Sequence, residues 1–108
     1  MEKQELKPTG VFKYFAEICQ VPRPSKKEEK IRKFLLDFAA ENGIAVRTDA
    51  IGNVAMSKPA TKGCEDAPCV VMQAHMDMVC VAAEGVAFDP MKDAIKVVND
   101  GQFISADG

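Results

Sequence analysis

The chain has 108 residues, of which 47% are hydrophobic and 28% are charged, so its composition is that of one ordinary globular domain. With 14 basic and 16 acidic residues its net charge is -2, which gives no electrostatic reason to expect a nucleic acid or an anionic membrane as partner. The apolar stretches are shorter than the roughly 20 residues that a membrane span needs, and the start, MEKQELKPTG, lacks the apolar core of a signal peptide. We therefore expect a cytoplasmic protein.

Two amphipathic helices are predicted in the first part of the chain. Apolar side chains recur at helical spacing through VFKYFAEICQV, residues 11–21, and Pro22 then ends the pattern. Ser25 is placed as the N-cap of the second helix, and Glu28 three residues later completes a capping box. That helix is expected to end where Gly43 supplies a left-handed cap. Its apolar face comprises Ile31, Phe34, Leu35, Phe38 and Ala39.

After the helices the sequence predicts a first pair of strands in a hairpin or meander, and later a second hairpin. IAVRTD and VAMS have the composition of strands, and the turn AIGN between them contains Gly52, which can adopt a positive φ. Later in the chain AIKVV and QFISA flank NDG, whose Asp100-Gly101 pair is a two-residue hairpin signal. No internal repeat, low-complexity tract or second domain is recognisable.

The most apolar segment, CVVMQAHMDMV at residues 69–79, is the best candidate for a central strand that is covered on both faces. Together with the predicted helices it indicates an α/β fold in which two helices pack on a mixed β-sheet.

The four cysteines are expected to be thiols, because no secretion signal accompanies them. Cys64 and Cys69, in CEDAPC, could hold a metal only with two further ligands that the sequence does not identify. Cys19 lies on the apolar stripe of the first helix and Cys80 follows an apolar strand, so both are interpreted as small buried hydrophobic residues.

His75 is the only histidine of the chain, and Asp77 follows it by two positions. In a strand Gln73, His75 and Asp77 would share one face, with Cα atoms of alternate residues about 6.5 to 7 Å apart. A carboxylate at that separation can accept one imidazole N–H and leave the second ring nitrogen for a metal ion, an arrangement common among metal-binding histidines. The motif alone is short, and a buried structural histidine held by a nearby acid is the competing interpretation.

The wider pattern resembles a known family, the di-zinc dipeptidases of the aminoacyl-histidine type, also called peptidase D or Xaa-His dipeptidase. Six segments carry the resemblance, in the order and at separations similar to those of the family. They are FAEICQVPRPSKKEEKI, DAIGNV, KPAT, VVMQAHMDMV, FDPMKDAI and DGQFISADG, and they span nearly the whole chain. The segment CVAAEGVA after Val79 does not match well.

The resemblance implies that His75 is a zinc ligand and that Asp77 is the catalytic-site carboxylate that holds its ring. It also implies that residues 1–108 are a single partial catalytic domain, the N-terminal portion of a metallodipeptidase with two zinc ions. The metal-bridging aspartate, the general-base glutamate and the other ligands would follow Gly108, and Asp107 precedes the bridging position. We therefore expect the isolated chain to be inactive, and the complete protein to take a dipeptide, Xaa-His or other, as substrate.

Other expectations concern partners and rival functions. We expect neither nucleic acid nor membrane as partner, and a homo-oligomer is possible. A non-catalytic α/β binding or scaffold module derived from the same fold is the alternative function. A serine or cysteine hydrolase is disfavoured, because Ser57 and Ser105 lie in no G-x-S-x-G motif and Cys80 has no identified base.

Overall fold

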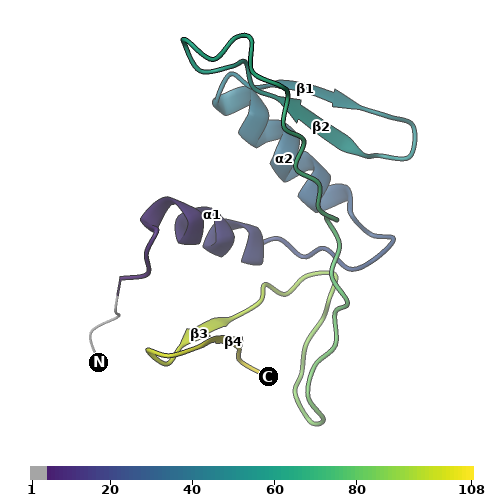
Figure 1. Ribbon diagram of the computed structural model, residues 1–108. Coiled ribbons are helices and arrows are strands. Elements are labelled where there is room, and N and C mark those ends of the chain that lie inside the picture. The colour runs from purple at the N-terminus through teal and green to yellow at the C-terminus, as the bar shows by residue number, and fades with distance from the viewer. Residues whose placement is uncertain (1–4) are drawn as a thin grey trace. The chain divides into compact units, whose positions relative to one another are not determined.

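The computed structural model describes residues 5–108, which contain two helices and two antiparallel hairpins (Figure 1). By their contacts they divide into two compact units: the described residues up to Ile31 with residues 77–108, and residues 32–76. The predicted α/β class is confirmed. No helix in this described part of the chain combines the length and the apolar character that crossing a membrane requires.

Helix α1 spans Thr9–Cys19, close to the predicted range, and belongs to the first unit. The rings of Phe12 and Phe15 on it meet edge to face, with centroids 6.5 Å apart. At its end the N–H of Val21 bonds to the carbonyl of Ile18 at 3.0 Å, a tightened last turn. Pro22, which lacks an N–H, follows, and the helix ends before this proline as predicted.

Helix α2 spans Glu29–Glu41 and ends as predicted. Gly43 has a φ of 63°, and the Ile44 N–H bonds to the Ala39 carbonyl at 2.8 Å while the Gly43 N–H bonds to Ala40 at 3.4 Å. These two bonds form a Schellman motif, which satisfies carbonyls at the helix end.

The predicted capping box at the start of α2 is wrong. The helix begins at Glu29, and the side chain of Glu28 accepts a hydrogen bond from the N–H of Lys26 at 2.8 Å, not from an N-cap serine. The hydroxyl of Ser25 instead donates a hydrogen bond to the carboxylate of Asp77.

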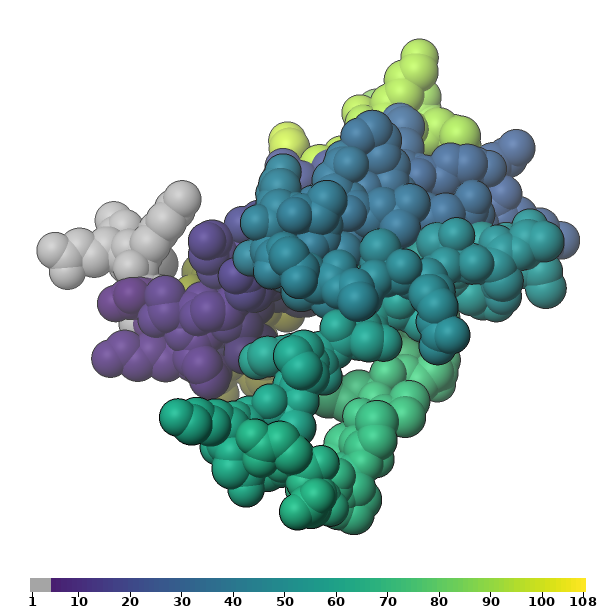
Figure 2. All heavy atoms as spheres, turned by 90° about the horizontal axis from the view of Figure 1, so that it is seen from above, coloured from purple at the N-terminus to yellow at the C-terminus, as the bar shows by residue number. Residues whose placement is uncertain are grey.

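In the second unit, β1 (Ala45–Thr48) pairs antiparallel with β2 (Val54–Ser57), which confirms the first predicted hairpin. Gly52 in its turn has a φ of 103°, a conformation that glycine adopts without penalty. Figure 2 shows the atoms of α2 and of this hairpin in contact, and the Nε of Arg32 donates to the Gly52 carbonyl at 3.1 Å. Ala39 is fully buried.

In the first unit, β3 (Val97–Asn99) pairs antiparallel with β4 (Ile104–Ala106). The second hairpin is confirmed, but its turn is not the predicted two-residue turn, because residues 100–103 connect the strands. The Asp100 carboxylate accepts the N–H groups of Gln102 at 2.8 Å and of Phe103 at 2.7 Å, which stabilises the longer connection.

The predicted central strand over residues 69–79 does not form in this structure. Residues 69–77 belong to no strand, and the side chains of Val70, Val71 and Met72 are 83%, 84% and 93% exposed. Only Met78 pairs, through a single parallel bridge to Pro24, while both hairpins are antiparallel. An extended segment becomes a strand only when neighbours satisfy its backbone groups, and the described residues place no strand beside this segment.

Candidate metal-binding site

His75 lies on the extended segment that precedes Met78, and its side chain is exposed. The interpretation of this residue as a buried structural histidine is therefore wrong. The boundary between the two compact units falls within the motif, since His75 belongs to the second unit and Asp77 to the first. An exposed imidazole is chemically suited to act as a metal ligand.

Asp77 is half-buried, and one of its carboxylate oxygens has a defined partner. The hydroxyl of Ser25 donates a hydrogen bond to Asp77 Oδ2 at 2.5 Å. The bond joins two residues that are far apart in the sequence but belong to the same compact unit.

The backbone next to Asp77 contacts Arg23, which lies two residues before Ser25. The N–H of Met78 donates to the Arg23 carbonyl at 2.9 Å, and the Arg23 guanidinium donates through Nη2 to the Met78 sulfur at 2.9 Å. Through Nη1 it also donates to the carbonyl of Ile18, near the end of α1, at 2.6 Å. Residues 23–25, which we call the clamp segment, thus hold residues 77–78 by contacts of both backbone and side chains.

These residues alone fit only part of a metal site. Among residues 5–108 no three side chains of histidine, cysteine, aspartate or glutamate gather closely enough to hold a metal ion. Catalytic zinc generally requires three protein ligands. The described residues therefore offer one exposed imidazole and one hydrogen-bonded carboxylate in the H-x-D motif, which by themselves do not make a complete metal site.

The cysteines form no site of their own in the described part of the chain. All four are free thiols, as predicted, and Cys64 and Cys69 are exposed without a metal cluster around them. Cys19 is buried, and this burial raises the pKa of its thiol, while the positive charge of Arg23 acts in the opposite direction. Cys80 is partly buried.

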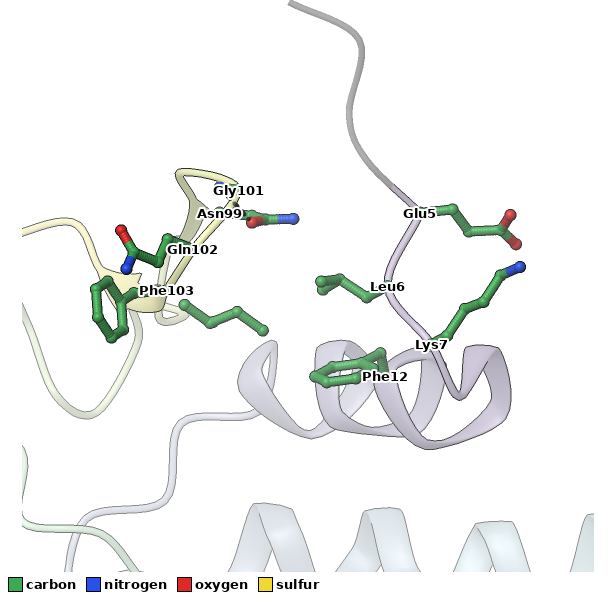
Figure 3. A pocket seen from close by; sticks show the side chains of 9 residues that line it. Glu5, Leu6, Lys7, Phe12, Asn99, Gly101, Gln102 and Phe103 are labelled. Carbon is green, nitrogen blue, oxygen red and sulfur yellow. Dashed lines mark hydrogen bonds between the residues drawn. The ribbon is translucent and has the colours of Figure 1, made fainter.

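Two hollows of the first unit are lined by residues other than His75 and Asp77. The first, of about 470 Å³, lies between the start of α1 and the β3–β4 connection. Figure 3 shows Leu6 and Phe12 facing this connection, while Glu5 and Lys7 point away. The second, of about 640 Å³, is lined mainly by apolar side chains of residues 78–82, 86–88 and 94–95. Neither combines a nucleophile with an oriented base.

The sequence does not indicate the hydrogen bond between Ser25 and Asp77. A serine after proline and before a helix is a common capping pattern, and no local feature indicates a bond to a residue 52 positions away. Only the fold reveals that Ser25 and Asp77 meet.

Comparisons with known proteins find dipeptidases. The chain is 38% identical over 107 residues to the cytosol non-specific dipeptidase of Escherichia coli K12, an alignment that covers 99% of this chain and 22% of that protein. The crystal structure of aminoacylhistidine dipeptidase from Vibrio alginolyticus superposes with a TM-score of 0.92 at 41% identity, covering 95% of this chain and 21% of that one. No family model matches the chain.

The resemblance to dipeptidases of the aminoacyl-histidine type is therefore confirmed in both sequence and structure. The chain spans about one fifth of the length of the relatives it matches, which is consistent with its being a portion of such a protein.

Proposed function

We propose that this chain is the N-terminal segment of a zinc-dependent dipeptidase that acts in the cytoplasm. The observation that carries the proposal is the alignment with a dipeptidase over 99% of the chain. The exposed imidazole of His75 and the held carboxylate of Asp77 support it, because they are the groups that a metal site of this kind needs.

In this proposal His75 ligates one of two zinc ions, and Asp77 accepts the N–H of the other ring nitrogen. That hydrogen bond selects the tautomer, fixes the plane of the ring and makes the ligating nitrogen more basic. When bound, zinc polarises a scissile carbonyl and supplies a nucleophilic water at neutral pH. The remaining ligands and the general base come from parts of the complete protein outside this chain, and the substrate is a dipeptide, Xaa-His or other.

The first prediction is that the segment is required for activity and is insufficient for it. In the complete protein, His75→Ala should lower kcat/KM by at least about 100-fold, and Asp77→Ala by about 10- to 100-fold, the range found for partners of metal ligands. The isolated 108-residue chain, supplied with zinc, should hydrolyse no dipeptide, because residues 5–108 bring together no set of three ligands. Hydrolysis is followed by amino-acid release from Xaa-His and other dipeptides.

The matched control is Asp66→Ala, which removes an exposed aspartate from a loop and should leave kcat/KM unchanged. Metal-dependent turnover by the isolated chain would refute its insufficiency. Unchanged activity of the complete protein after either site substitution would refute the assigned roles and favour the non-catalytic scaffold module.

A further inference from the structure

We infer that Ser25 is a positioning residue for Asp77, and that the clamp segment sets the orientation of the carboxylate on which the metal-ligand histidine depends. The inference rests on the proposed function and adds a residue to it. Ser25 touches neither metal nor substrate in this scheme and acts through Asp77 alone.

The hydrogen bond from Ser25 fixes one end of the carboxylate. In this bond the hydroxyl of Ser25 is the donor and Oδ2 of Asp77 is the acceptor. A carboxylate can accept about four hydrogen bonds, so this bond is compatible with a second one from an imidazole N–H. Anchoring Oδ2 restricts rotation of the carboxyl group and thereby restricts where the second bond can form.

Local hydrogen bonds, independent of Asp77, fix the backbone of the clamp segment. Pro24 has a restricted φ, and the Lys27 N–H bonds to the Pro24 carbonyl at 2.9 Å, which closes a tight turn around Ser25 and Lys26. Lys26 has a φ of 69°, which is unusual for a residue with a side chain, and its N–H is bonded to Glu28. The backbone that carries Ser25 therefore has little freedom to move.

The position of Asp77 relative to this turn is also fixed independently of Ser25. The 2.9 Å bond from the Met78 N–H to the Arg23 carbonyl sets the register between the two segments. The Arg23 guanidinium also donates hydrogen bonds to the sulfur of Met78 and to the carbonyl of Ile18 near the end of α1. Removal of the Ser25 hydroxyl should thus take away this anchor of Oδ2 while the backbone stays in place.

The second prediction follows for the complete protein. Ser25→Ala should weaken zinc binding by about tenfold and lower kcat by a similar factor with little change in KM, because ligand positioning is lost while substrate contacts remain. Ser25→Thr keeps a hydroxyl and should stay within about threefold of the wild type in both quantities. Zinc affinity is measured on the metal-free protein by competition with a chromophoric chelator, and folding by thermal unfolding.

Ser105→Ala is the matched control, since Ser105 is an exposed serine of the same compact unit in strand β4. A zinc affinity and kcat of Ser25→Ala equal to those of Ser105→Ala would overturn the inference. It would also be overturned if Ser25→Thr were as impaired as Ser25→Ala, or if the losses came with a lowered unfolding temperature, since the role would then be structural.

The proposed function and this inference fail in distinguishable ways. If His75→Ala leaves activity intact, the proposed function fails. If His75→Ala abolishes activity and Ser25→Ala behaves like the control, only the positioning role is lost.

Discussion

At the residue scale, two aspartates organise the two hairpin turns by the same chemistry. Asp49 accepts the side-chain amide of Asn53 at 2.7 Å, and its Oδ1 accepts the backbone N–H groups of Asn53, Gly52 and Ile51. Asp100 accepts the backbone N–H groups of Phe103 and Gln102. In both cases hydrogen bonds to the charged form lower the pKa of the carboxyl below its usual value, for Asp49 chiefly through Asn53 and for Asp100 chiefly through Phe103.

The third prediction concerns the pH dependence that Asp49 creates. Its lowered pKa means that its contribution to stability is fully present above the usual carboxyl pKa of 3.8 and is lost as the pH falls through the lower pKa of the folded state. In the variant Asp49→Asn the side chain cannot ionise, so the pH-dependent contribution of Asp49 to the free energy of unfolding is removed. Wild type should therefore lose more stability than Asp49→Asn between about pH 5 and pH 2, as measured by thermal unfolding followed by circular dichroism.

The control for this experiment is Asp66→Asn, an exposed aspartate in the same compact unit. It should leave the acid-side stability profile of the wild type unchanged. Parallel profiles for wild type and Asp49→Asn would show that the turn does not depend on the ionised carboxylate.

At the element scale, helix boundaries depend on backbone conformation more than on side-chain contact. Gly10 lies within α1 and Gly43 ends α2, and a Cβ atom added at either position would meet no other atom within 4 Å. The two sites differ in the backbone, because Gly43 has a φ of 63° and Gly10 is helical. The two glycines therefore form a matched pair, because an added methyl group would clash with no neighbouring atom at either position.

The fourth prediction uses this pair. Gly10→Ala should stabilise the protein by about 0.5 to 1 kcal/mol, because alanine favours the helix and restricts the unfolded chain. Gly43→Ala should destabilise it by about 1 kcal/mol, because a Cβ is unfavourable in the left-handed conformation. Denaturant unfolding of both variants measures the two changes, and a change of the same sign in both would contradict the backbone explanation.

At the scale of the whole molecule, the described chain buries few apolar side chains. Only Cys19, Ile31 and Ala39 are buried among the hydrophobic residues described. The segment around the candidate site is exposed and apolar, with Val70, Val71, Met72, Val79 and Val81 all at least 79% exposed. Such a surface on an extended backbone favours association with other chains.

The fifth prediction is that the isolated 108-residue chain is marginally stable and self-associates. Sedimentation velocity over a range of concentrations should show association that the double substitution Val70→Lys and Val71→Lys weakens by more than about tenfold, since charges on an exposed extended segment oppose its pairing with another chain. The charge-matched control is the double substitution Ala60→Lys and Thr61→Lys, in an exposed loop. A monodisperse and highly stable wild-type monomer would contradict the prediction.

The sequence by itself determined the elements whose causes are local. Pro22 and Gly43 end the two helices, and Gly52 allows the turn of the first hairpin, because these residues restrict or permit φ within their own segment. The H-x-D motif and the flanking segments were likewise sufficient to reveal the resemblance to dipeptidases, which both comparisons bear out.

Tertiary structure decided the features that depend on a partner distant in the chain. Ser25 had two possible uses for one hydroxyl, and the proximity of Asp77 determined that it binds the carboxylate and does not cap α2. The apolar run at residues 69–77 had the pattern of a buried strand, yet a strand exists only when neighbouring strands accept and donate its backbone hydrogen bonds. A short-range pattern specifies which conformation is favourable, whereas the available neighbours determine whether its hydrogen bonds can be made.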